Sequence, residues 1–359
     1  MGSLKAKKWI LLCLMAAWTS CLREKPVYEP YGGFEPVDLN DGWIISTPEA
    51  EDVDRETLSR AFEMIYREDD YPLATALLVA RHNRLIGEAY PRGEDYIQRY
   101  HNIQSCTKSI TSLLLGAAAD QQIISSLNER LYDIFPELFD DDEVKREMII
   151  AHALTMQTGI NFENDRHTLE LYSTEMNSTA FVLSLDRIYR PGTGVQYQDG
   201  APHLISKVIE EKSGQTLSQF AQSVFFSKMG IYNWQWEAAK DGTDFGAFSL
   251  YLTARDLAKI GRLILQRGQW QGEQLVDSSY LREALSHQVN IDLNDQPYGY
   301  YFWLYPEWNA YAALGHGGQF LFVAPDKDLV VVYLAWPYTA PELWGDSKQL
   351  MQRVLDSCH

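Results

Sequence analysis

Strand-forming segments lie near both ends of this 359-residue chain, and the long stretch between them has mostly helical patterns. Near the N-terminus, residues 75–80 and 84–90 flank the turn His82-Asn83, which predicts a β-hairpin. Three C-terminal segments are rich in the aromatic and β-branched residues that favour strands: 298–303, 319–323 and 329–335. The sequence therefore predicts an α+β fold, with an antiparallel sheet formed from both chain ends, flanking helices and a largely helical insertion at about 125–288.

Two helices have local sequence signals. Residues 105–119 place apolar side chains at helical spacing, which predicts a helix with one strongly apolar face. A second helix is predicted to begin at Thr253, because the sequence that follows Thr253 is a plausible capping sequence. A further helix is expected over 345–355, close to the C-terminus.

The N-terminal segment has the pattern of a signal peptide, which we place at residues 1–20. Three lysines precede an apolar run at 9–18 that is shorter than the roughly 20 residues needed to span a bilayer. Small residues lead into Cys21, which resembles the lipid-modified cysteine of a bacterial lipoprotein. The expected location is the bacterial envelope, in the periplasm, with a lipid anchor at Cys21. Ordinary signal cleavage and an uncleaved anchor are the alternatives.

Residues 21–53 are rich in Pro, Gly and acidic residues, a composition typical of a tether. The folded domain is expected over 54–359. The formal net charge of −18 disfavours nucleic acid as a partner, since phosphates would be repelled. It also disfavours adsorption to anionic lipid, so membrane contact is expected only through the lipid anchor. The expected partner is a small molecule or a short peptide or amide, and the oligomeric state is left open.

The candidate chemistry centres on Ser105 and Lys108 in the run Gln104-Ser105-Cys106-Thr107-Lys108. A serine hydroxyl needs a base within hydrogen-bond reach to act as a nucleophile. The i, i+3 spacing places both side chains on one helix face. Burial is expected to lower the pKa of Lys108, so that it can accept the serine proton. The helix N-terminus would also direct the backbone N–H of Ser105 toward an oxyanion.

Two later motifs support this interpretation. Tyr197-Gln198-Asp199 ends a glycine-containing loop ahead of a helical run, and Gly315-His316-Gly317-Gly318-Gln319 leads into a strand. With the three motifs in this order, the chain resembles the serine β-lactamase and penicillin-binding-protein-like hydrolases. It is most similar to the class C-related branch, which includes esterases, D-aminopeptidases, carboxypeptidases and hydrolases of short amide oligomers. The resemblance covers roughly residue 54 to the C-terminus.

The resemblance implies a role for each motif residue. Ser105 would be the nucleophile that accepts the acyl group, Lys108 its base, and Tyr197 the proton shuttle to the leaving group and later to water. The third motif, His316-Gly317-Gly318, would line the pocket, and Gln319 would supply the second oxyanion N–H. An unperturbed tyrosine titrates near ~10, so Tyr197 needs a neighbouring positive charge to act as a phenolate.

Two residues depart from the family pattern. Asp199 replaces an asparagine and would tether Lys108, and His316 replaces a lysine that grips the carboxylate of penicillins. A neutral histidine is a weaker anion clamp. We therefore expect a serine hydrolase of small esters or amides, of the carboxylesterase or amidase/peptidase type. A D,D-peptidase or weak β-lactamase is one alternative, and a non-catalytic envelope-binding lipoprotein is another.

Other catalytic classes lack their motifs. The chain has no Gly-x-Ser-x-Gly elbow, no His-Glu-x-x-His and no Cys-x-x-Cys. We accordingly expect no metal and no cofactor. Cys106 and Cys358, the cysteines beyond the N-terminal segment, differ so much in position that both are expected to stay free thiols.

Overall fold

A nine-stranded sheet joins the two ends of the chain, in the order β1-β3-β2-β14-β13-β12-β11-β10-β9. Its strands are β1 (Ile44–Ile45), β2 (Ala74–Arg81), β3 (Arg84–Ala89), β9 (Val289–Ile291), β10 (Gln296–Tyr298), β11 (Trp303–Tyr305), β12 (Ala310–Gly315), β13 (Gln319–Ala324) and β14 (Leu329–Ala335). Neighbouring strands are antiparallel, except for β1 beside β3. The expected antiparallel sheet built from both chain ends is confirmed.

This computed structural model describes residues 28–67, 69–291, 295–339 and 341–359. The expected signal peptide and Cys21 lie outside these residues. Within the described ranges, no helix combines the length and the apolar character needed to cross a membrane. Cys106 and Cys358 are both buried free thiols.

The centre of the sheet is formed by the N-terminal hairpin, β2 and β3, and the last strand, β14, which pairs with β2. His82 and Asn83 have φ values of 49° and 61°, the left-handed conformation that a tight two-residue hairpin turn requires. The hairpin strand β2 then pairs with β14 along its length, with Leu77 opposite Tyr333. The long insertion is therefore enclosed between two segments that meet in one sheet.

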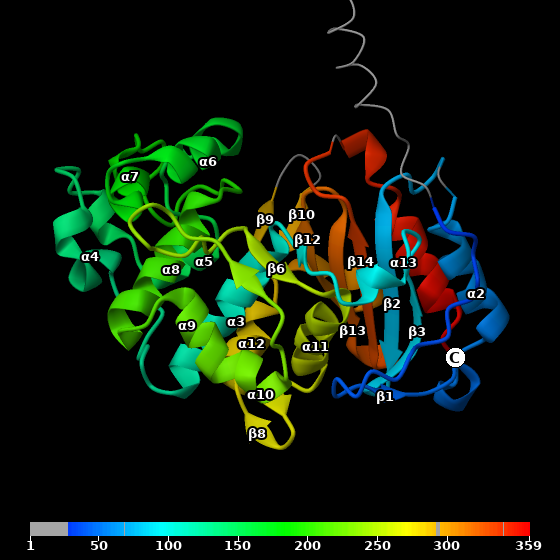
Figure 1. Cartoon of the computed structure of the whole chain (residues 1–359). Helices are drawn as coiled ribbons and strands as arrows, with labels where there is room; N and C mark the ends of the chain where they lie inside the picture. The colour runs from blue at the N-terminus through cyan, green and yellow to red at the C-terminus, as the bar shows by residue number, and fades with distance from the viewer. Residues whose placement is uncertain (1–27, 68, 292–294, 340) are drawn as a thin grey trace, which may run out of the picture.

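Helices cover both faces of the sheet (Figure 1). Helices α2 (Arg55–Met64) and α13 (Ser347–Asp356) pack on one face, over a core that contains Phe62 and Tyr333. Helix α11 (Ala254–Leu265) lies on the other face, against β14 and β13. It begins as expected, with Thr253 Oγ1 accepting a hydrogen bond from the backbone N–H of Asp256 at 3.1 Å. Gly261 permits the close approach, since an ideal Cβ there would lie 2.5 Å from Val330 Cγ1.

Residues 28–53 belong to the folded domain, unlike the free tether that their composition predicted. Strand β1 pairs with β3, and Phe34 stacks on Phe62 with ring centroids 4.6 Å apart. The Trp43 indole N–H donates to the carbonyl of Arg255 at 3.2 Å, and the guanidinium of Arg255 contacts Asp41 at 3.0 Å. Two buried aromatic rings and the ion pair between Asp41 and Arg255 help to hold this segment, and average composition does not reveal such isolated anchors.

The insertion is largely helical, as expected, and lies beside the sheet (Figure 1). Its helices are α4 (Leu131–Ile134), α5 (Ile150–Leu154), α6 (Asn164–Ser173), α7 (Ser178–Ser184), α8 (Gly200–Ser213), α9 (Leu217–Ala221), α10 (Ser227–Met229) and α12 (Ser278–Ala284). Two small sheets accompany them, formed by β4 (His101–Asn102), β5 (Gln235–Trp236) and β6 (Leu250–Leu252), and by β7 (Gln269–Trp270) and β8 (Glu273–Gln274). Helix α3 (Cys106–Asp120), predicted at 105–119, connects the insertion to the sheet.

Candidate active site

Ser105 stands at the N-terminus of α3, immediately after a sharp backbone turn. Gln104 has a φ of 52°, which is uncommon for a residue with a side chain. Its backbone N–H donates to Asn102 Oδ1 at 2.9 Å, which holds the turn. The chain thus passes from strand β4 into helix α3 with only three residues between them. Ser105 lies at this junction, and its side chain is half-buried.

Lys108 lies one turn further along α3 and is buried, with 1% of its side chain exposed. Its Nζ atom contacts three oxygen atoms: Ser105 Oγ at 2.7 Å, Asp199 Oδ1 at 2.7 Å and the Ala247 carbonyl at 3.2 Å. A lysine ammonium has three N–H donors, and three acceptors satisfy all of them. The surroundings therefore fit a protonated Lys108.

The pKa of Lys108 is shifted upward, opposite to the sequence-based expectation. Burial lowers the pKa of the ammonium, but the charge of Asp199 and the interaction with Tyr197 raise it further than burial lowers it. The expected fall was wrong because it considered burial without the counter-charge. The Asp199 carboxylate comes from the N-terminus of α8, which is far from Lys108 in sequence.

Asp199 is itself held by helix α6. Thr168 Oγ1 donates to Asp199 Oδ2 at 2.7 Å, and the backbone N–H of Asp199 donates to Asn164 Oδ1 at 2.9 Å. The expected tether between Asp199 and Lys108 is present in the structure. Thr168 and Asn164 were missed by sequence reasoning, because no spacing or motif connects α6 to Ser105.

Tyr197 lies beside Lys108, with the Lys108 Nζ atom 5.0 Å from the centroid of its ring. The ring also packs against Trp303 and Tyr298, at centroid distances of 5.7 and 6.2 Å. These strand residues come from β11 and β10 on the sheet. The first two motifs are thus brought together around the buried Lys108 ammonium.

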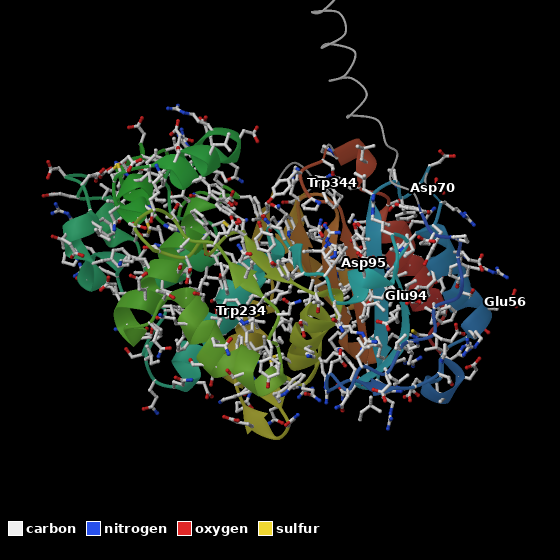
Figure 2. All side chains as sticks on the ribbon, in the orientation of Figure 1. Glu56, Asp70, Glu94, Asp95, Trp234 and Trp344 are labelled. Carbon is white, nitrogen blue, oxygen red and sulfur yellow. The ribbon has the colours of Figure 1, made fainter. Side chains whose placement is uncertain are left out.

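The third motif forms the turn between β12 and β13. His316 is exposed, and its ring contacts Trp344 edge-on at 4.8 Å. Figure 2 shows Trp344 at the upper end of the sheet. Gly317 and Gly318 have φ values of 81° and 86°, and an ideal Cβ on Gly317 would lie 2.7 Å from the Pro337 Cα atom. The two glycines are therefore needed for this tight turn, whereas His316 stands at its outer side.

Gln319 opens strand β13 opposite Gly315. An ideal Cβ on Gly315 would lie 2.4 Å from the carbonyl oxygen of Ile103, so the motif turn packs against the loop that carries Ser105. The Gln319 side chain is buried and donates to the Ala335 carbonyl at 2.8 Å, which fixes the turn to β14. This side-chain role had no signal in the sequence.

The described residues contain no group of three or more His, Cys, Asp or Glu side chains that could hold a metal ion. The arrangement instead offers the hydroxyl of Ser105, the buried ammonium of Lys108 and the phenol of Tyr197 in one partly buried cluster. Such a set can transfer a proton and stabilise negative charge on oxygen.

Comparisons with known proteins show the family and the fold. The family profile described as "Beta-lactamase" matches residues 73–336. The chain is 23% identical over 346 residues to a 6-aminohexanoate-dimer hydrolase of Paenarthrobacter ureafaciens, which covers 88% of this chain and 82% of that protein. It is similar in fold to a family VIII carboxylesterase, with a TM-score of 0.70, 16% identity and coverage of 88% and 99% of the two chains. A penicillin-binding protein homologue from Caulobacter crescentus gives a TM-score of 0.66, 14% identity and coverage of 84% and 97%.

Proposed function

Because the chain belongs to the β-lactamase family, a family of hydrolases, we propose that it is a serine hydrolase of small esters or amides. The reaction would pass through an acyl-enzyme on Ser105. One observation carries the proposal: the buried Lys108 ammonium contacts Ser105 Oγ at 2.7 Å, with Tyr197 beside it.

The charge of Lys108 decides the direction of proton transfer. A protonated lysine cannot accept the serine proton, but it can stabilise a phenolate on Tyr197. Tyr197 would then accept the proton of Ser105 as its Oγ bonds to the substrate carbonyl carbon. The phenol would return this proton to the leaving oxygen or nitrogen as the carbonyl–leaving group bond breaks. In the second half, Tyr197 would accept a proton from water as the water oxygen bonds to the acyl carbon. It would return this proton to Ser105 Oγ as the bond between Oγ and the acyl carbon breaks.

The oxyanion formed in each step needs hydrogen-bond donors. We assign this role to the backbone N–H groups of Ser105, at the start of α3, and of Gln319, at the start of β13. The tight packing of Gly315 against the Ile103 carbonyl supports the assignment, since it brings the start of β13 to the Ser105 loop.

The substrate proposal follows from the exposed third motif. His316 lies against Trp344 at the outer side of its turn, where it supplies no fixed positive charge like that of a lysine. This favours esters and small amides over penicillins, whose carboxylate needs a cationic clamp. The similarity to an amide-dimer hydrolase and to a carboxylesterase supports the same class. A D,D-peptidase or weak β-lactamase is the second candidate, supported by the similarity to a penicillin-binding protein homologue.

A labelling experiment tests the proposal. A fluorophosphonate probe should label the wild-type protein at Ser105 and fail to label Ser105→Ala. Failure to label the wild type, or equal labelling of both, would refute the hydrolase proposal and favour the non-catalytic alternative. Turnover of p-nitrophenyl esters, D-amino-acid amides, D-Ala-D-Ala peptides and nitrocefin then separates the candidates. Rapid nitrocefin turnover would overturn the preference for esters and amides.

The proposed location remains the bacterial envelope, with the lipid anchor at Cys21. The basic segment, the short apolar run and the small residues before Cys21 support this proposal.

A further inference from the structure

A cavity of about 500 Å³ adjoins the loop that carries Ser105. Its walls come from residues 98–102, Tyr251 and residues 336–338. Asn102, one wall residue, precedes Ser105 by three positions, so their Cα atoms are at most about 11 Å apart. The turn of the third motif borders the cavity, because Gly317 packs against Pro337, a wall residue. The cavity therefore adjoins both the loop that carries Ser105 and the third motif.

The cavity gathers exposed aromatic side chains. Tyr100, Trp336 and Tyr338 are 40%, 42% and 68% exposed, and all three line it. Large apolar surfaces clustered around a hollow are typical of a binding site. The walls are also fixed: the Tyr338 hydroxyl accepts a hydrogen bond from Asn102 Nδ2 at 2.8 Å, and the Tyr251 hydroxyl donates to Glu237 at 2.8 Å.

Arg99 gives the cavity a positive charge. Its guanidinium lies 4.8 Å from the ring centroid of Tyr96 and 5.9 Å from that of Trp336. In the part of the chain that the structure describes, no carboxylate pairs with Arg99 and no acidic residue lines the cavity. In a chain with a net charge of −18, an unpaired arginine beside aromatic faces is well suited to bind an anion.

His101 also lines the cavity. Its side chain is buried, with the residue 6% exposed, and its Nε2 atom has no hydrogen-bond partner among the described residues. Burial, with the charges of Arg99 and Arg92 acting the same way, lowers the pKa of His101 to about 4. The ring is therefore neutral at pH 7. The neutral ring therefore adds no charge to the cavity wall, where Arg99 carries the positive charge.

We propose that this cavity is a substrate subsite that binds an aromatic ring carrying a carboxylate. The ring would lie on the faces of Trp336 and Tyr338, and the carboxylate would pair with Arg99. The proposal rests on the proposed hydrolase function for its role in turnover, but binding to the cavity can be measured without turnover.

Calorimetry on the Ser105→Ala variant tests binding in the absence of chemistry. The probe is 3-phenylpropionate, compared with phenethylamine, which has the same ring and the opposite charge, and with hexanoate, which has no ring. We expect 3-phenylpropionate to bind at least about tenfold more tightly than either, since a charge-assisted hydrogen bond contributes on this order. Adding Arg99→Gln should abolish the preference over phenethylamine, and adding Trp336→Ala should abolish the preference over hexanoate. Trp336→Phe should keep both preferences.

Arg60→Gln is the matched control for Arg99→Gln. Arg60 is also exposed, but it pairs with Glu56 on α2. Figure 2 shows Glu56 at the edge of the molecule away from the insertion. This variant should bind the three probes as its parent does.

Kinetics of the otherwise wild-type protein test the link to Ser105. The substrates are 4-acetoxybenzoate and phenyl acetate, which transfer the same acetyl group and differ in the carboxylate. Arg99→Gln should lower the ratio of their kcat/KM values about tenfold, and Arg60→Gln should keep it. Equal binding of the three probes, or an unchanged ratio in Arg99→Gln, overturns the subsite. A third outcome is selective binding to Ser105→Ala without any turnover by the wild-type protein. That outcome refutes the hydrolase function and the subsite's role in binding substrate, and it leaves an aryl-carboxylate binding site.

Discussion

The replacement Asp199→Asn tests whether Lys108 acts as an ammonium. It removes the counter-charge 2.7 Å from Lys108 Nζ but keeps an oxygen that can accept the hydrogen bond. Removing one partner of a buried ion pair costs about 3–5 kcal/mol, and the retained acceptor should reduce the loss to about 2–3 kcal/mol. Urea unfolding at neutral pH measures this loss.

The pH dependence of stability should change as well. Because the pKa of Lys108 is raised in the folded protein, its contribution is complete below the ordinary lysine value and is lost as pH rises through the folded pKa. The free energy of unfolding of the wild type should therefore fall above about pH 10. In Asp199→Asn this part of the alkaline fall should be smaller.

Activity gives the decisive readout. If the Lys108 ammonium is required, kcat/KM falls when this group loses its proton at alkaline pH. Asp199→Asn lowers the pKa of Lys108, so that the alkaline limb should move to lower pH. If neutral Lys108 were the base, the same variant would raise kcat/KM near pH 7. An increase at pH 7 with an unmoved alkaline limb would refute the reasoning.

Asp256→Asn provides a matched control. Asp256 and Lys259 form a second buried pair at 2.9 Å, with side chains 11% and 3% exposed, against 11% and 1% for Asp199 and Lys108. Lys259 also donates to a backbone carbonyl, that of Gly230. The control should lose similar stability while its pH–rate profile keeps the wild-type shape.

Three further predictions concern other parts of the chain. Thr168→Ala removes the 2.7 Å hydrogen bond to Asp199, and kcat/KM for p-nitrophenyl acetate should fall about fivefold to tenfold, with a smaller shift of the alkaline limb than in Asp199→Asn. Gly261→Ala places a Cβ about 2.5 Å from Val330 Cγ1, so thermal unfolding should show a loss of roughly 1–3 kcal/mol with the active-site probe still reacting. Cys21→Ser should abolish palmitate labelling and move the protein from the membrane fraction to the soluble fraction; retained labelling would contradict the proposed anchor.

Much of the fold was predictable because its signals are local. The hairpin at His82-Asn83, the capped helix at Thr253 and the strand over 329–335 all form as the sequence predicts. The prediction for residues 28–53 differed because it used average composition. Two buried rings, Phe34 and Trp43, hold that segment against partners that only the fold brings near.

The candidate site likewise has one part that the sequence predicts and one part that only the fold sets. The sequence by itself determined that Ser105 and Lys108 share a helix face, because an i, i+3 spacing is set within one turn. Only the tertiary structure decided the charge of Lys108, since Asp199 arrives from α8 and Thr168 fixes it from α6. Spacing along one helix determines which atoms can touch. The pKa of a buried group also depends on every charge packed around it, and those charges come from segments far apart in the sequence.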